Sequence, residues 1–124
     1  METIIVQDTD QTVLEMLTAA LELGNFKVYP LMNYEDDFLS LIDQLRPHAV
    51  LIDYPLHGEQ CLAVCRSIKE KYPHLPVIAS SCNNNIHKEY DKLGFDGYLE
   101  KPFDLDLLYR ILRKHIPQLN VKAD

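Results

Sequence analysis

The amino-acid sequence predicts an α/β fold, in which five parallel strands form a doubly wound sheet covered by five helices. Three short apolar runs indicate strands buried on both faces of such a sheet, at residues 4–6, 49–52 and 77–79. Stretches with apolar residues at helical spacing alternate with these runs, and right-handed crossovers would place the helices on both faces. A chain of 124 residues suits one domain with its own core. These observations favour (βα)5 order.

The first half of the chain contains two predicted strand–helix units. After the strand at residues 4–6, the apolar stripe of the first helix consists of Val13, Leu17, Ala20 and Leu21. Gly24 stands where the C′ residue of that helix belongs. A weaker strand is expected at residues 26–31. The stripe of the next helix consists of Phe38, Leu41, Ile42 and Leu45. Pro47 ends this second helix.

Three more units follow in the second half. The third helix follows the strand at residues 49–52 and has the stripe Cys61, Val64, Cys65, Ile68 and Tyr72. The fourth follows the strand at residues 77–79; it is shorter and more polar, and runs into Gly94 with the stripe Ile86, Tyr90 and Leu93. After a weaker strand at residues 97–99, the last helix has the stripe Leu105, Leu108, Leu112 and Ile116. Asp104 is its expected N-cap, and its basic last turn matches the helix dipole.

Composition excludes several classes of function. Acidic residues number 19 and basic residues 12, so the formal charge is −7, which argues against a nucleic-acid partner. The N-terminus has no basic segment followed by a long apolar one, and no apolar run approaches the ~20 residues that cross a bilayer. The three cysteines lack CxxC spacing, which favours reduced thiols over disulfides or a zinc site. We therefore expect a cytoplasmic protein without membrane or nucleic-acid contacts.

Polar side chains stand at the expected carboxyl ends of the strands. Asp8 follows the first strand, Asp53 the third, Ser81 the fourth and Lys101 the fifth. In doubly wound sheets this edge is where ligands bind. Carboxylates gathered there would repel one another unless a cation such as Mg²⁺ compensates them. A lysine and a hydroxyl suit phosphoryl oxygens, and an aspartate attacking a phosphoryl donor would form an acyl phosphate.

The order and spacing of these residues resemble the receiver domain of bacterial two-component response regulators, with its CheY-like, flavodoxin-like fold. The motif elements are an acid after the first strand, Asp53, Ser81, the triplet Lys101-Pro102-Phe103, and Tyr98 three residues before the lysine. The resemblance covers nearly the whole chain. It implies a receiver domain at residues 1–117 followed by a short tail at residues 118–124.

The resemblance assigns roles to the residues of the site. Asp53 would accept a phosphoryl group from a phosphohistidine on a histidine kinase or phosphotransfer protein. Asp8, Asp53 and the backbone carbonyl of Pro55 would bind Mg²⁺. Lys101 would pair with the phosphate.

Two further residues would transmit the signal. Ser81 would bond a phosphoryl oxygen and move toward it, and Tyr98 would then turn inward as the aromatic switch. The face formed by the fourth helix, fifth strand and fifth helix would contact a downstream protein target. We expect a monomer or weak homodimer that acts as a switch rather than a turnover enzyme, and a stand-alone receiver without an output domain.

The first acidic motif departs from the family pattern. The family usually has two adjacent acids after the first strand, whereas here the pair is either Asp8 and Thr9 or, with a longer loop, Gln7 and Asp8. One carboxylate is missing in both registers, which predicts weakened Mg²⁺ binding. Asp10 could substitute through a shifted loop, but a helix N-cap is the favoured interpretation of this residue.

Two alternatives therefore stand beside the phosphorylated switch. The first is a pseudo-receiver, a protein-interaction module that works without phosphorylation. The second is a phosphatase of the haloacid-dehalogenase type, whose DxDxT motif residues 8–12 resemble. The short chain, the Lys101-Pro102-Phe103 triplet and an otherwise unexplained Asp53 weigh against this second alternative.

Overall fold

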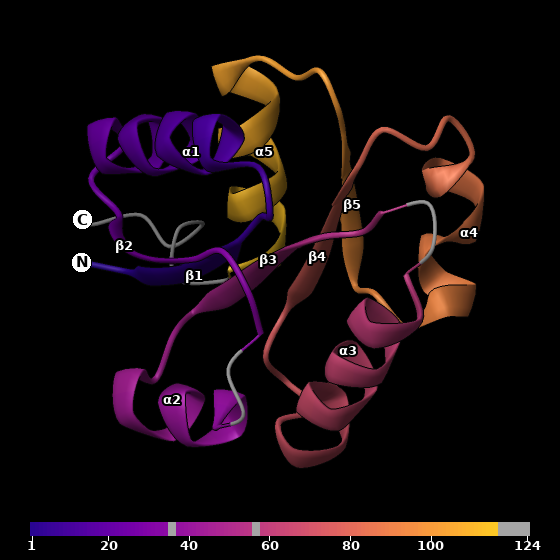
Figure 1. The fold of residues 1–124 in the computed structure, drawn as a ribbon. Coiled ribbons are helices and arrows are strands. Elements are labelled where there is room, and N and C mark those ends of the chain that lie inside the picture. The colour runs from indigo at the N-terminus through magenta and orange to yellow at the C-terminus, as the bar shows by residue number, and fades with distance from the viewer. Residues whose placement is uncertain (35–36, 56–57, 117–124) are drawn as a thin grey trace.

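The computed structural model describes residues 1–34, 37–55 and 58–116, and the expected tail at residues 118–124 lies outside this part. Its elements alternate as predicted (Figure 1). The strands are β1 (Thr3–Gln7), β2 (Lys27–Leu31), β3 (Ala49–Asp53), β4 (Val77–Ser81) and β5 (Gly97–Glu100). The helices are α1 (Gln11–Leu23), α2 (Phe38–Leu45), α3 (Glu59–Lys71), α4 (Ile86–Leu93) and α5 (Leu105–His115). The predicted α/β class is confirmed.

The strand order explains where the site lies. All strands are parallel, in the order β2-β1-β3-β4-β5. The chain passes from β1 outward to β2 and then crosses back to β3, so strand order reverses between β1 and β3. Ligand crevices of open α/β sheets form at such a switch point, outside the carboxyl ends of the strands. The segments that follow Gln7 and Ile52, which are register partners, therefore border this crevice.

The sheet is buried because helices pack on both of its faces. One core lies between the sheet and α1 and α5, and it includes the buried Leu17, Leu21 and Leu112. The other lies between the sheet and α2, α3 and α4, and it includes Cys61 and Cys65, whose expected core positions are confirmed (Figure 1). The edge strand β2 is more exposed and contains a proline, which edge positions tolerate.

The helix ends at Asp104 and Gly94 follow the prediction, and the one at Gly24 differs. Asp104 caps α5 by accepting from the backbone amide of Leu107 at 2.8 Å. Gly94 ends α4 with a left-handed φ of 103°. Gly24 was expected to be the C′ residue of α1, but its φ is −84° and the left-handed residue is Asn25, with φ 69°.

Close packing against α5 explains why residue 24 is a glycine. A Cβ atom there would lie 2.7 Å from the ring of Tyr109 on α5, so this glycine allows α1 and α5 to approach closely.

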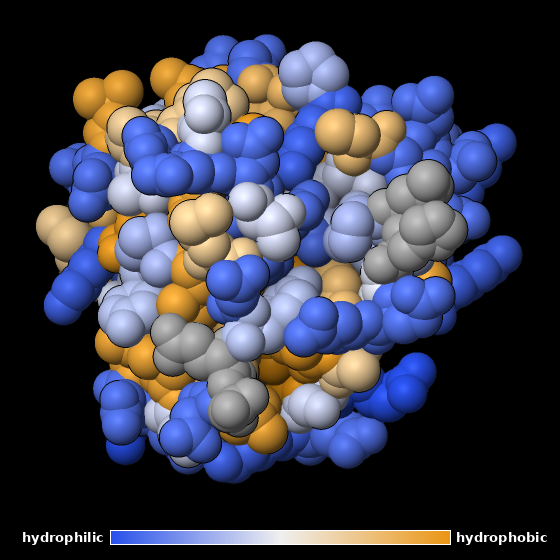
Figure 2. Space-filling model, viewed as in Figure 1, coloured by the Kyte–Doolittle hydropathy of each residue, from blue (hydrophilic) through white to orange (hydrophobic). Residues whose placement is uncertain are grey.

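The surface is that of a charged globular domain. The face drawn in Figure 2 is mostly hydrophilic, and its hydrophobic residues lie in separate patches. In the part of the chain that the structure describes, no helix combines the length and apolar character that crossing a membrane requires.

Candidate functional site

The polar residues at the strand ends line one cavity of about 450 Å³ at the carboxyl edge of the sheet. Its lining includes five of the six residues predicted from sequence, namely Asp8, Asp53, Pro55, Ser81 and Lys101. A larger hollow of about 860 Å³ lies at the opposite edge of the sheet, and none of the predicted residues lines it. The smaller cavity is therefore the candidate site.

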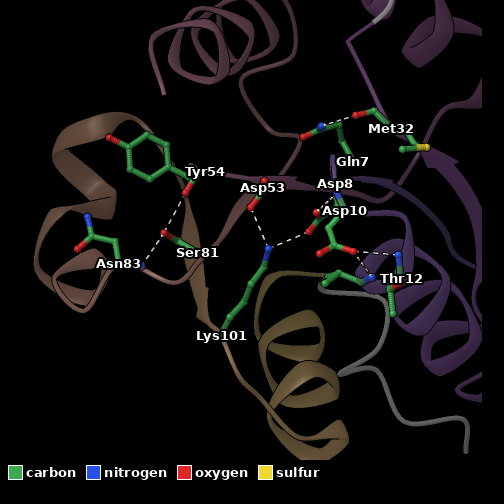
Figure 3. Close-up of polar contacts among 11 residues, drawn as sticks. Gln7, Asp8, Asp10, Thr12, Met32, Asp53, Tyr54, Ser81, Asn83 and Lys101 are labelled. Carbon is green, nitrogen blue, oxygen red and sulfur yellow. Dashed lines mark hydrogen bonds and ion pairs between the residues drawn. The ribbon is translucent and has the colours of Figure 1, made fainter. Parts of the chain in front are cut away.

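Lys101 lies between the carboxylates of Asp8 and Asp53. Its Nζ donates to Asp8 Oδ2 at 2.8 Å and to Asp53 Oδ1 at 2.9 Å (Figure 3). The side chains of Lys101 and Asp53 are each 14% exposed and that of Asp8 is 2% exposed, so water and salt screen these pairs little. Burial lowers the pKa of Lys101, but the hydrogen bonds to Asp8 and Asp53 outweigh it and raise the pKa above its ordinary value. The lysine is therefore charged at neutral pH and compensates one carboxylate.

The loop after β1 is organised by its own carboxylates. The backbone amide of Asp10 donates to Asp8 Oδ1 at 2.9 Å, so both oxygens of Asp8 have partners. Asp10 Oδ1 in turn accepts from the backbone amides of Thr12 at 2.9 Å and Val13 at 3.2 Å. The favoured interpretation of Asp10 as the N-cap of α1 is confirmed.

The structure decides between the two registers of the acidic motif. Gln7 turns away from the cavity, because its Nε2 donates to the carbonyl of Met32 at 3.0 Å (Figure 3). Thr9, by contrast, lines the cavity beside Asp8. Asp8 and Thr9 thus occupy the places of the expected acid pair, and the second place holds a hydroxyl instead of a carboxylate.

Ser81 ties the end of β4 to the loop that follows Asp53. Its Oγ donates to the carbonyl of Tyr54 at 3.0 Å and accepts from the backbone amide of Asn83 at 3.0 Å. Asn83 and its neighbour Cys82 also line the cavity. Neither residue was among the site residues predicted from sequence, although Cys82 stands directly after the fourth strand and Asn83 follows it.

Tyr98 lies apart from the carboxylates. Its ring centroid is 5.0 Å from that of Tyr90 and 6.5 Å from that of His87, both on α4. It lines a separate hollow of about 440 Å³ that also includes Glu100, Leu107, Ile111 and Lys114. The structure therefore places Tyr98 on the α4–β5–α5 face, not in the candidate site.

The donors of the cavity fit Mg²⁺. Among the described residues, no three His, Cys, Asp or Glu side chains gather into a group that could hold a metal ion. Mg²⁺ does not require such a group, because it keeps several waters and binds through one or two carboxylates together with phosphate oxygens. Asp8, Asp53 and the carbonyl of Pro55 are donors of this kind.

The cysteines are expected to differ sharply in reactivity. Cys82 is exposed on the cavity rim, whereas Cys61 and Cys65 are buried under α3. Burial raises the pKa of Cys61 to about 11 and that of Cys65 to about 12, so both thiols are protonated at pH 8. We expect iodoacetamide to modify Cys82 alone in the native protein and all three cysteines in denaturant, with intact mass as the measurement. Native modification of Cys61 or Cys65 at the rate of Cys82 would contradict the buried packing of α3.

Comparison with known proteins agrees with this geometry. The family model described as "Response regulator receiver domain" matches residues 4–113. A response regulator from Thermotoga maritima is similar, with 27% identity and a TM-score of 0.79 over 94% of this chain and 98% of that one. A response regulator receiver domain protein from Clostridium thermocellum shares the fold, at 21% identity and a TM-score of 0.81 over 97% of this chain and 98% of that one. So does the response regulator protein TrrA from Thermotoga maritima in complex with Mg²⁺-BeF, at 22% identity and a TM-score of 0.79 over 93% and 99%.

Proposed function

Because the chain belongs to the response regulator receiver domain family, we propose that it is a switch in which Asp53 accepts a phosphoryl group. Receiver domains are signalling switches that interact with histidine kinases and downstream effectors. The observation that supports Asp53 is its place in the cavity, where Lys101 holds Oδ1 and no hydrogen bond from the described residues reaches Oδ2. One oxygen is thus oriented while the other is available as a nucleophile.

The donor is a phosphohistidine on a histidine kinase or phosphotransfer protein. A carboxylate oxygen of Asp53 forms a bond to phosphorus, the phosphorus–nitrogen bond breaks, and its electron pair stays on the imidazole. Such transfer depends on positioning and on neutralising charge. Lys101 is placed to pair with the phosphoryl oxygens. Asp8, Asp53 and the Pro55 carbonyl would hold Mg²⁺, which would supply further positive charge when bound.

Phosphorylation is read out through Ser81. Its hydroxyl breaks its hydrogen bond to the carbonyl of Tyr54 and donates to a phosphoryl oxygen instead. This change loosens the contact between β4 and the loop after β3. Tyr98 then leaves its tilted ring contact with Tyr90 and turns inward. The downstream protein contacts the α4–β5–α5 face, whose hollow changes shape when this ring moves.

Acetyl phosphate tests the proposal directly. Wild-type protein incubated with acetyl phosphate and Mg²⁺ is expected to gain the mass of one phosphoryl group, because Asp53 lies beside a cationic Lys101 and within a cation-binding donor set. Asp53→Asn removes the nucleophile and is expected to gain none. Intact-mass spectrometry under neutral conditions is the measurement. An unchanged wild-type mass, or an equal gain in Asp53→Asn, would overturn the proposal.

One observation favours a second candidate, a pseudo-receiver that binds partners without phosphorylation. Thr9 stands in the place of the second acid of the expected pair, and Lys101 already compensates one of the two carboxylates, Asp8 and Asp53, with which it pairs. A Mg²⁺ titration separates the candidates. Absence of binding at millimolar Mg²⁺ would favour the pseudo-receiver.

A further inference from the structure

We propose that Asp10 supplies the missing acid of the cation site while it caps α1, by accepting a hydrogen bond from a water bound to the ion. This inference rests on the proposed function and concerns the Mg²⁺ site of the same cavity. It assigns two roles to one carboxylate, with one oxygen for each role.

The hydrogen bonds of Asp10 leave one oxygen available. Both capping bonds, from the amides of Thr12 and Val13, end on Oδ1. No hydrogen bond from the described residues reaches Oδ2. Figure 3 shows Asp10 next to Asp8, with one oxygen on the bonds to α1 and the other turned away from them. Capping therefore uses only half of this carboxylate.

The loop after β1 holds Asp10 at the wall of the cavity. Its backbone amide donates to Asp8 Oδ1 at 2.9 Å, and Asp10 lines the same cavity as Asp8 and Asp53. This hydrogen bond links Asp10 to the residue that is placed to bind the ion.

A water-mediated contact is the form that the geometry supports. Asp8, Asp10 and Asp53 do not form a group in which all three carboxylates could coordinate one ion directly. Mg²⁺ keeps several waters when it binds to proteins, and carboxylates that accept from those waters raise affinity. Asp10 also adds a negative charge that Thr9 does not provide, so the acids around the ion number three instead of two.

Asp10→Asn separates the two roles. Asparagine caps helices about as well as aspartate, so the thermal unfolding midpoint in EDTA is expected to stay near that of wild type. Loss of the charge and of the second carboxylate oxygen is expected to weaken cation binding about tenfold. Asp104→Asn is the matched control, because Asp104 caps α5 in the same way but does not line the cavity.

The protein is titrated with Mn²⁺, whose free ion is measured by electron paramagnetic resonance, and Mg²⁺ is then added as a competitor. Weaker binding by Asp10→Asn, with Asp104→Asn within twofold of wild type, supports the role of Asp10. Equal binding by the two variants overturns it, and so does a wild-type protein that binds neither ion.

This outcome is distinguishable from failure of the proposed function. A wild-type protein that binds the ion through Asp10 and gains no phosphoryl mass from acetyl phosphate would retain the cation site and lose the phosphoacceptor role of Asp53. As a second variant, Asp10→Ser keeps a capping oxygen without a carboxylate and is expected to match Asp10→Asn.

Discussion

Replacing Lys101 with methionine is expected to destabilise the metal-free protein by about 3 kcal/mol. The methionine leaves Asp8 and Asp53 in a cavity where their side chains are 2% and 14% exposed and no longer share a cation. Removing one partner from a buried ion pair costs more than the pair contributes, because the remaining charge has lost its water. Urea unfolding in EDTA measures the difference.

Mg²⁺ is expected to restore much of this loss. An ion that binds the native Lys101→Met protein between the same carboxylates stabilises it in proportion to the logarithm of its concentration over Kd. Lys69→Met is the matched control. Lys69 is also half-buried and pairs with Asp96 at 2.8 Å, but it lies outside the cavity, so this variant should lose stability that Mg²⁺ does not return. Equal responses of the two variants to Mg²⁺ would show that Lys101 does not occupy the place of a cation.

Sequence patterns predicted the fold because each element has a local cause. A run such as residues 49–52 is apolar on both sides of the strand, and the structure buries it between two helical layers. Asp104 and Gly94 marked helix ends through preferences of single residues. The prediction for Gly24 was wrong because packing explains this glycine. It lies against the ring of Tyr109 on α5, and this contact joins helices that are far apart in the sequence.

The site was predictable to the extent that parallel strands bring their ends together. Asp8, Asp53 and Lys101 met at one edge because each follows a strand of the same sheet. The choice between Gln7 and Thr9 depended on the carbonyl of Met32, which only the folded loop after β2 brings within reach. Roles in phosphoryl transfer remain predictions, because they depend on a bound phosphoryl group and a cation.

Replacing Thr9 with aspartate is expected to strengthen Mg²⁺ binding about 30-fold, since a unit charge near 4 Å from a divalent ion contributes roughly 2 kcal/mol even in water. Asp8, Asp10, Asp53 and Lys101 line the cavity and together carry a charge of −2, and an acid at position 9 makes it −3. Thr9 is exposed and already lines the cavity, so the new carboxylate needs no rearrangement of the core. It also restores the adjacent acid pair that the receiver family usually has. Isothermal titration calorimetry of the metal alone measures the change.

Thr12→Asp separates a specific ligand from a general increase in negative charge. Thr12 lies three residues further along, on the first turn of α1, and does not line the cavity. The same added charge should therefore change Mg²⁺ affinity by less than about threefold, because water and salt screen an exposed charge that lies outside the cavity. If Thr9→Asp and Thr12→Asp raised affinity equally, the carboxylate at position 9 would act only through the overall charge. If Thr9→Asp alone raised it, the weak point of the natural site would be the hydroxyl beside Asp8, because every other donor is unchanged in that variant.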